Sequence, residues 1–199
     1  MINVMLTGVG GQGTVLAAKV LAQAAQKKGW QVRTAETIGM AQRGGNVVSH
    51  VRMGNAGEEV CAPLLAHKTA NLIIAFEPAE AARVLPYLAP GATLVSATTP
   101  IQPVTVALSS KPYRAQDVLA YTKTQVEKNG GQFVTVDDAG ILERLGNRKA
   151  LNTVLLARAL ATDCIPLTLQ DLRSAIQACV KPQFVDLNLQ AIDIATQDV

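Results

Sequence analysis

The sequence predicts one α/β domain over residues 1–199, a three-layer α/β/α arrangement with a mostly parallel sheet and a helical C-terminal part. Two observations predict this fold class. Short apolar runs alternate with segments in which apolar residues recur at helical spacing, as in sheets whose strands are joined by helices. The length of 199 residues also suits a single domain with an ordinary hydrophobic core.

The N-terminal segment predicts a strand, a glycine-rich turn and a helix. An apolar run over 2–7 precedes the turn, and the segment Thr14–Lys28 after it has helical periodicity. The turn contains Gly8, Gly10, Gly11, Gln12 and Gly13. Of these, Gly8, Gly10 and Gly13 fit the G-x-G-x-x-G pattern of Rossmann-like folds, and Gly11 is an extra glycine. The N–H groups of a first helical turn attract anions, and glycine permits close approach. We therefore expect a phosphate or nucleotide here, and a turn that only packs closely is the alternative.

The following elements are predicted from apolar runs and chain breakers. The predicted strands are 31–35, 46–53, 71–76, 93–96 and 133–136, and the predicted helices are 78–88, 115–129, 149–161, 168–179 and 182–195. Pro78 suits the first position of a helix, and Asp137 suits the cap of a further helix. Pro90 and Gly91 are expected to separate a helix from a strand, and the proline-bearing segment 98–113 to be irregular.

The composition limits the classes of function. Hydrophobic residues make up 49% of the chain and charged residues 17%, which indicates a well-filled core and a surface kept for a partner subunit. A net charge of +3 is too small to indicate nucleic-acid binding. No apolar stretch is long enough for a membrane span, and no signal peptide is apparent. We therefore expect a cytoplasmic protein that binds neither nucleic acid nor membrane.

The cysteines and histidines do not form a metal-binding pattern. Cys61, Cys164 and Cys179 are far apart in the sequence, which argues against a disulfide framework, a structural zinc and an iron–sulfur cluster held by this chain alone. We expect these cysteines to be buried as small apolar residues. His50 and His67 are not in a metal-ligand spacing. The sequence assigns no metal ligand, no nucleophile and no general base.

A second motif follows the second predicted strand. Glu36 lies where the ribose-binding acid of a nicotinamide dehydrogenase would be expected. However, the segment 37–45 is a polar, glycine-bearing loop that leads directly into strand 46–53, instead of a crossover helix. We therefore expect a hairpin-type insertion at the carboxyl edge of the sheet, where ligands bind in this fold class.

The end of this loop offers donors for an anion. Arg43 provides a fork of N–H groups beside Gln42, Gly44 and Gly45, which suits a phosphate or a carboxylate. A surface turn with an exposed arginine is the alternative. Glu36 is expected either to bind a ribose or to hold Arg43 as an ion pair.

Several blocks resemble one family. GVGGQG, AETIGMAQRGGNVVSHVRMG and AFEPAEAARVLPYL, with KALNTVLLARAL and LNLQAIDIA near the C-terminus, resemble the gamma-type subunit or domain of 2-oxoacid:ferredoxin oxidoreductases. The chain is most similar to the beta subunit of the indolepyruvate enzymes in that family. The resemblance covers nearly the whole chain, and the second block is the most diagnostic.

The resemblance implies a partial enzyme. Its reaction would be the coenzyme A-dependent oxidative decarboxylation of a 2-oxoacid to an acyl-CoA, CO2 and reduced ferredoxin. Thiamine diphosphate and the iron–sulfur clusters would be bound by larger partner subunits, and ferredoxin would be met through the complex. This chain would bind no cofactor tightly but would help to hold coenzyme A, a co-substrate, and to complete the assembly. A homodimer through the helical C-terminus is a further expectation for the isolated chain.

The resemblance also implies roles for the two motifs. The backbone of Gly10–Gly13 would contact the phosphates of coenzyme A, and Arg43, Gly44 and Gly45 would contact coenzyme A or the partner subunit. Glu77 and Glu80 start a helix, where its dipole favours acids, so stabilisation is their expected role. Arg148 and Asn152 are also near a helix start, but the sequence does not show whether they face the same cleft.

Two other functions stay open at this point. A stand-alone NAD(P)-binding dehydrogenase predicts a crossover helix after Glu36 and binding of NAD(H) or NADP(H) by the isolated chain. A nucleotide-binding regulatory module predicts a nucleotide complex but no association with an iron–sulfur protein. The loop 37–45 disfavours the dehydrogenase.

Overall fold

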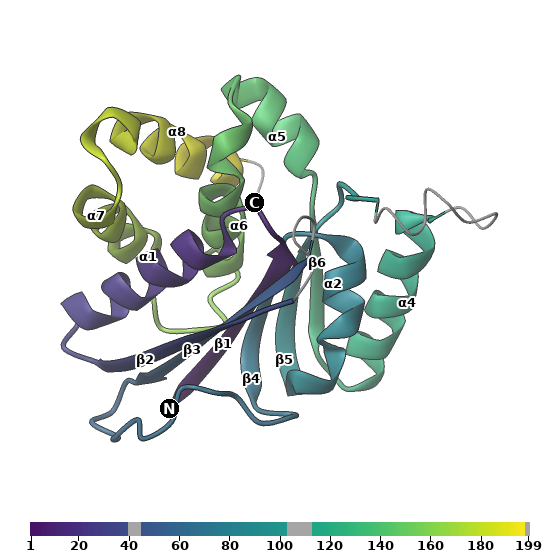
Figure 1. Ribbon diagram of the computed structural model, residues 1–199, viewed down its shortest axis with the longest axis horizontal. Helices are drawn as coiled ribbons and strands as arrows, with labels where there is room; N and C mark the ends of the chain where they lie inside the picture. The colour runs from purple at the N-terminus through teal and green to yellow at the C-terminus, as the bar shows by residue number, and fades with distance from the viewer. Residues whose placement is uncertain (40–44, 103–112, 198–199) are drawn as a thin grey trace.

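The computed structural model describes residues 1–39, 45–102 and 113–197, and these confirm the α/β fold (Figure 1). The described part of the chain forms a six-stranded sheet in the order β2-β3-β1-β4-β5-β6. The strands are β1 (Ile2–Val9), β2 (Gln31–Ile38), β3 (Asn46–Gly54), β4 (Ala70–Ala75), β5 (Leu88–Ala97) and β6 (Gln132–Val136). Parallel pairing joins β1 to β4, β4 to β5 and β5 to β6, so the sheet is mostly parallel.

Helices cover both faces of the sheet and give the predicted three layers (Figure 1). One face carries α1 (Thr14–Lys27), α5 (Asp138–Leu145), α6 (Leu151–Leu160), α7 (Leu169–Cys179) and α8 (Val185–Thr196), which share one hydrophobic cluster with β1 and β4. The other face carries α2 (Pro78–Arg83) and α4 (Ala115–Lys128), whose buried Ala81 and Val126 belong to a second cluster. The buried β4 segment 72–75 is apolar on both faces, as expected for a strand between two helical layers.

The predicted hairpin insertion is confirmed. Strand β3 pairs antiparallel with both of its neighbours, β2 and β1, and it is the strand whose direction opposes the others among the described elements. With a crossover helix after β2, β2 itself would lie beside β1. Here the chain turns back after β2, and β3 lies between β2 and β1 instead. This insertion brings the start of β3 to the carboxyl end of β1.

The predicted helix 78–88 is wrong beyond Arg83. A 3-10 turn (Leu85–Tyr87) follows α2, and β5 begins at Leu88 instead of at residue 93. Pro86 explains the first change, because proline inside an α-helix removes a hydrogen bond and clashes with the preceding turn. Pro90, expected to break the chain, lies inside β5 where the pairing with β4 shifts register between Ala70 and Leu72. Proline is tolerated at such an irregularity.

The helical C-terminal part is confirmed, with altered starts. Two of its predicted helices begin as 3-10 turns, Arg148–Ala150 before α6 and Pro182–Phe184 before α8. Helix α7 begins with a capping box, in which Thr168 and Asp171 satisfy each other's backbone N–H groups. Asp137 caps α5 as predicted, because its side chain accepts from the N–H of Gly140.

The prediction of buried cysteines is wrong. Cys61 and Cys179 are exposed, and Cys164 is half-buried. Each lies in or beside a loop or a helix end, where small apolar character alone does not lead to burial. Over the ranges that the structure describes, no helix is long and apolar enough to cross a membrane.

Candidate functional site

The glycine-rich turn lies at the carboxyl edge of the sheet, between β1 and α1. Gly11 and Gly13 have φ angles of 98° and 87°, in the left-handed region that favours glycine. Gly8 has a different role: a Cβ there would lie 2.8 Å from Gln12 Oε1 and 2.8 Å from Phe76 Cβ. The turn therefore needs Gly8 for internal packing, whereas Gly11 and Gly13 set the direction of the backbone.

The side chain of Gln12 holds the turn together. Its Oε1 accepts from the N–H of Val9 at 2.7 Å, and its Nε2 donates to the carbonyl oxygen of Phe76 at 2.7 Å. The amide thereby joins the end of β1 to the residue after β4. Gln12 was expected to contact a ligand through its backbone, but its N–H also donates internally, to the carbonyl oxygen of Val9.

Two of the backbone N–H groups expected to contact phosphate are therefore occupied. The N–H of Gly10 donates to the carbonyl oxygen of Gly45 at 2.9 Å, which brings the two sequence motifs into contact. The N–H groups at the start of α1 remain: Gly13 precedes the helix without a side-chain cap, and the first turn contains no acidic residue. Since first-turn N–H groups have no intrahelical acceptor, the N-terminus of α1 is the anion-attracting part of the turn.

A cavity of 560 Å³ opens beside this helix N-terminus. It lies between the glycine-rich turn, the residues that follow the carboxyl end of β5, and the starts of α5 and α6. Its walls are formed by Gly11, Gln12, Gly13, Leu16, Thr99, Pro100, Ile101, Asp138, Ala139, Leu142, Arg148, Lys149, Leu151 and Asn152. The structure thus answers the question that the sequence left open, because Arg148 and Asn152 do face the cleft of the glycine-rich turn.

Asn152 has an unsatisfied polar atom at this cavity. The residue is 6% exposed, and its Oδ1 is buried without a hydrogen-bond partner among the described residues. A Cβ on Gly13 would lie 3.6 Å from Asn152 Cβ, an ordinary van der Waals distance, so the turn lies directly beside α6. A buried acceptor without a donor is costly, and a ligand that donates a hydrogen bond at the cavity would satisfy this one.

The charge around the cavity favours an anion. Arg148 and Lys149 are exposed on its wall, and no ion pair within the described ranges involves either one. Asp138 also lines the cavity, but its Oδ1 accepts from the N–H groups of Thr98 and Thr99, at 2.9 and 3.0 Å. These donors neutralise part of the charge of Asp138, whereas both cations remain available. Sequence reasoning missed Lys149, Asp138 and Thr99, which come to the cavity from other elements.

Glu36 does not lie at the glycine-rich turn. It is exposed on β2, opposite Ser49 of β3, and β3 separates it from β1. Neighbouring strands are about 4.8 Å apart, so this insertion moves the carboxylate roughly 10 Å away from β1. Gln42, Arg43 and Gly44 lie outside the described residues, whereas Gly45 is placed by its bond to Gly10.

The acidic residues of α2 have the structural role expected of them. Glu77 is buried and caps the helix, with its Oε2 accepting from the N–H groups of Ala79 and Glu80. Its Oε1 accepts from the hydroxyl of Tyr113 at 2.6 Å, and burial and this bond raise the pKa of Tyr113. Burial likewise raises the pKa of Glu80, which the guanidinium of Arg83 opposes. No group of three metal-binding side chains occurs among the described residues.

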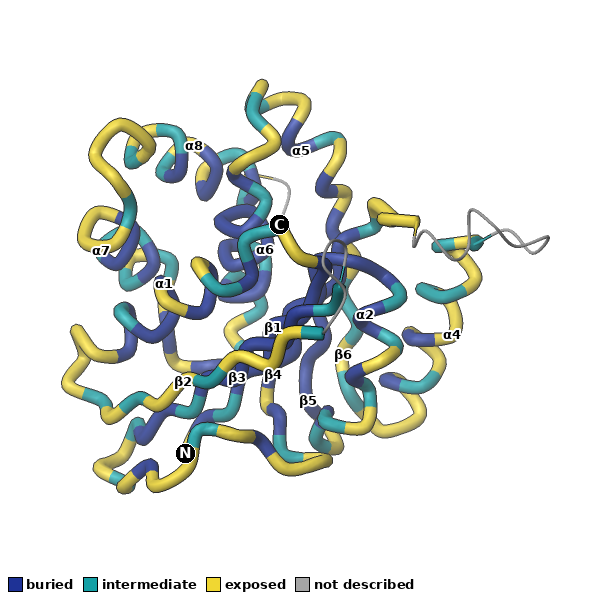
Figure 2. The backbone as a smooth tube through the Cα atoms, viewed as in Figure 1, coloured by how far each residue is buried: buried dark blue, intermediate teal, exposed yellow. Residues whose placement is uncertain are grey.

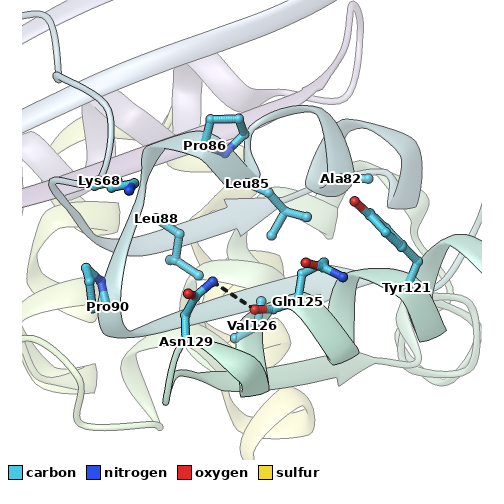
Figure 3. A pocket seen from close by; sticks show the side chains of 10 residues that line it. All are labelled: Lys68, Ala82, Leu85, Pro86, Leu88, Pro90, Tyr121, Gln125, Val126 and Asn129. Carbon is cyan, nitrogen blue, oxygen red and sulfur yellow. Dashed lines mark hydrogen bonds between the residues drawn. The ribbon is translucent and has the colours of Figure 1, made fainter.

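Another cavity, of 340 Å³, lies near the opposite edge of the sheet (Figure 3). Its walls come from α2, the following 3-10 turn, the start of β5 and the end of α4, and include Leu85, Leu88, Tyr121 and Asn129. Asn129 Nδ2 donates to the carbonyl oxygen of Gln125 at 3.0 Å, so this polar side chain is used within α4. Ligands of open α/β sheets bind at the carboxyl edge, which favours the cavity beside Gly13.

The sequence matches known proteins over nearly its whole length. The family model for pyruvate ferredoxin/flavodoxin oxidoreductase matches residues 3–197. Indolepyruvate oxidoreductase subunit IorB of Thermococcus kodakarensis is 34% identical over 195 residues, which cover 98% of this chain and 94% of that protein. The subunit of the same name from Archaeoglobus fulgidus is 35% identical over 191 residues, which cover 96% and 92%.

Solved structures share the fold at lower identity. The gamma subunit of keto/oxoacid ferredoxin oxidoreductase from Geobacter sulfurreducens has a TM-score of 0.69 at 19% identity and covers 98% of this chain and 96% of its own. The 2-oxoglutarate:ferredoxin oxidoreductase from Magnetococcus marinus, with 2-oxoglutarate, coenzyme A and succinyl-CoA bound, has a TM-score of 0.69 at 16% identity, and the match covers 30% of that longer chain. With the family model matched from residue 3 to residue 197, the chain belongs to the pyruvate ferredoxin/flavodoxin oxidoreductase family.

Proposed function

We propose that this chain is the small, gamma-type subunit of a cytoplasmic 2-oxoacid ferredoxin oxidoreductase that acts on indolepyruvate or a similar aryl pyruvate. The relatives that are 34% and 35% identical over nearly the full chain are named as indolepyruvate oxidoreductase subunits, which supports this substrate class. The reaction would be the coenzyme A-dependent oxidative decarboxylation of the oxoacid, with ferredoxin as the electron acceptor.

The observation that carries the proposal is the cavity beside the N-terminus of α1. Coenzyme A has phosphates, which suit the uncapped helix and the cations Arg148 and Lys149. Its pantetheine arm has amide N–H groups, which suit the unpartnered Oδ1 of Asn152. Its thiol would accept the acyl group. This chain would bind and orient the co-substrate, and we assign it no proton-transfer or nucleophilic role.

The other cofactors are proposed to lie on partner subunits. Iron–sulfur clusters need grouped cysteine ligands, and the three cysteines of this sequence are dispersed. For thiamine diphosphate, the proposal rests on the family to which the chain belongs. Leu16 and Ile101 support contact with a partner, since these apolar side chains are 41% and 38% exposed on the rim of the cavity. A larger subunit that covers this rim would exclude water from the bound thiol.

The position of Glu36 weighs against a stand-alone dehydrogenase. In dinucleotide-binding folds the ribose-binding acid ends the strand next to β1, whereas here β3 intervenes. Strand β3 pairs antiparallel with β2, and only residues 39–45 lie between the two strands, too few for a crossover connection. A regulatory nucleotide-binding module makes different predictions about partners, which the following experiment separates.

The first experiment is an anaerobic purification of the tagged chain from its native host. We expect a partner that contains iron–sulfur clusters and thiamine diphosphate, together with coenzyme A-dependent reduction of a viologen dye by indolepyruvate. A chain that purifies alone and binds NAD(H) would overturn the proposal. A chain that binds a nucleotide but no iron–sulfur protein would instead support the regulatory module.

A second experiment tests the cavity in the assembled enzyme. Replacing Arg148 by alanine would remove one phosphate contact, and we expect the KM for coenzyme A to rise roughly tenfold to a hundredfold, because one charge-assisted bond contributes about 1.5–3 kcal/mol. The KM for the oxoacid should not change. Lys19→Ala is the matched control, since Lys19 is exposed on the same helix as the turn but does not line the cavity. An unchanged KM for coenzyme A in Arg148→Ala would show that Arg148 does not contact coenzyme A. Arg43→Ala tests the second motif in the same assay.

A further inference from the structure

Strand β2 is an edge strand with an unpaired outer side. It pairs with β3 on one side and has no neighbour on the other among the described elements. The N–H of Gly39 donates to the carbonyl oxygen of Asn46. In an antiparallel pair of strands every second residue is hydrogen-bonded to the neighbour, so the N–H and C=O groups of the odd-numbered residues of β2 point towards β3. The backbone groups of Val32, Thr34, Glu36 and Ile38 therefore point outward, and they have no partner in the part of the chain that the structure describes. Figure 2 shows β2 as largely exposed.

This edge has few of the features that protect edge strands from pairing. It is eight residues long, contains no proline, and pairs with β3 without a register shift. Its charged residues are Arg33 and Glu36, one of each sign. Ile38 is 67% exposed, although it is a large apolar residue in a strand. A long, regularly paired edge strand with an exposed apolar residue is suited to pairing with another strand.

We propose that β2 pairs antiparallel with β2 of a second copy of this chain, with Ala35 on the two-fold axis. A two-fold axis perpendicular to the sheet places the same face of the sheet on the same side in both copies. Odd-numbered residues of one β2 therefore lie opposite odd-numbered residues of the other, and even-numbered residues lie opposite even-numbered ones. With Ala35 at the centre, Thr34 lies opposite Glu36, and Val32 lies opposite Ile38. These are the residues whose backbone groups point outward, so every outward N–H gains an acceptor.

The side chains favour this register over its neighbours. Val32, half-buried, covers the exposed Ile38 of the other copy, and Arg33 lies opposite the small, polar Thr37. With Glu36 on the axis instead, two carboxylates would lie directly opposite each other, which is destabilising. With Thr34 on the axis, Ile38 would extend beyond the paired strand and remain exposed. The register with Ala35 at the centre therefore joins the edge to itself without a charge conflict.

This interface has a consequence for the candidate site, although the proposal does not depend on coenzyme A binding. Strand β2 forms a hairpin with β3, and the residue before β3 is Gly45, which accepts from Gly10 of the glycine-rich turn. Pairing of two β2 strands makes a continuous sheet through both copies and supports each hairpin from its open side. The dimer thus differs from one formed through the helical C-terminus, which lies over the α1 side of the sheet (Figure 1).

A cysteine cross-link tests the register in the full chain. In a background where Cys61 and Cys179 are replaced by serine, Ala35→Cys places two thiols opposite each other at a non-hydrogen-bonded pair, within reach of a disulfide. We expect a covalent dimer on mild oxidation. Thr37→Cys in the same background is the control, because its counterpart lies several residues away. Equal cross-linking of both variants, or none of Ala35→Cys, would overturn the proposed register.

A pair of charge variants tests the interface without oxidation. Thr34→Glu places a carboxylate opposite Glu36 of the other copy, and we expect the dimer dissociation constant to rise roughly tenfold, because the two-fold axis doubles the penalty. Thr34→Lys places an opposite charge there and should keep or strengthen the dimer. Sedimentation velocity of the folded chain measures both. A monomer at all concentrations, a dimer indifferent to both changes, or an edge that pairs only with a larger partner subunit would each overturn the proposal.

Discussion

The backbone N–H of Gly10 donates a hydrogen bond of 2.9 Å to the carbonyl oxygen of Gly45. These residues belong to the two glycine-bearing motifs, which the sequence presents as separate ligand contacts. The bond makes them one structure at the carboxyl edge of the sheet, and it occupies an N–H that was expected to contact phosphate. The anion-binding capacity of the turn therefore shifts towards the start of α1 and the cations of the neighbouring cavity.

Substitutions of two glycines in the turn should differ in their cost to stability. A Cβ at Gly8 would meet Gln12 Oε1 and Phe76 Cβ at 2.8 Å and Thr14 Cγ2 at 3.0 Å. Gly8→Ala should therefore lower the free energy of unfolding by about 1–3 kcal/mol. At Gly10 the nearest atom, the carbonyl oxygen of Gly45, is 3.7 Å away, and Gly10→Ala should cost less than about 1 kcal/mol. Urea unfolding of both variants measures the difference, and equal losses would contradict the packing described.

Gln12 is expected to stabilise the turn rather than to contact a ligand. Gln12→Ala leaves the N–H of Val9 and the carbonyl oxygen of Phe76 without a partner, so the free energy of unfolding should fall by about 1–3 kcal/mol. Gln26→Ala, on the exposed side of α1, should change it by less than about 0.5 kcal/mol. If both variants unfold alike in urea, the amide of Gln12 does not hold β1 to β4.

Asn152 should show a conflict between stability and binding. Asn152→Leu removes a buried oxygen that has no partner, so the free energy of unfolding should stay level or rise by up to about 1 kcal/mol. Asn188→Leu is the matched control, because the equally buried Asn188 bonds to Thr153 and Phe184, and its loss should cost about 1–3 kcal/mol.

The same pair of variants separates binding from stability. In the assembled enzyme, Asn152→Leu should raise the KM for coenzyme A, whereas Asn188→Leu should leave this KM unchanged wherever the protein is folded. Destabilisation by Asn152→Leu as large as that of Asn188→Leu would mean that the Oδ1 of Asn152 has a structural partner, such as a bound water.

His50 is expected to make stability depend on pH. The buried ring accepts at Nδ1 from the N–H of Leu65 at 3.2 Å, and burial lowers its pKa below 6.5. The unfolded chain therefore takes up a proton at a higher pH than the folded chain. Stability should be constant above pH 6.5, as far as this group is concerned, and should fall as the pH drops below that value.

A substitution isolates this contribution from those of other groups. His50→Asn keeps an acceptor near the N–H of Leu65 but does not titrate, so the fall in the free energy of unfolding below pH 6.5 should be smaller than in the unaltered protein. His67→Asn is the control, because His67 is exposed. An identical pH dependence in His50→Asn and the unaltered protein would refute the assignment.

Local patterns predicted most of the elements, and their errors have local causes. The strand–turn–helix unit and the capped helix after Asp137 follow from apolar periodicity and capping residues, and both occur in the structure. Pro86 ended α2 early, and Pro90 was accommodated inside β5 because the pairing shifts register there. Burial of cysteines was wrong because residue type alone does not determine depth.

The sequence by itself determined the alternation of strands and helices, the glycine-rich turn and the hairpin after Glu36, since these depend on residues that are close in the chain. Only the tertiary structure decided which groups meet. Arg148, Lys149 and Asn152 reach Gly13 because α6 packs beside α1, and Glu36 is kept from β1 because β3 inserts between the strands. Such contacts depend on the order of strands and on the packing of helices, which hydrophobic burial selects over the whole chain and no local pattern specifies.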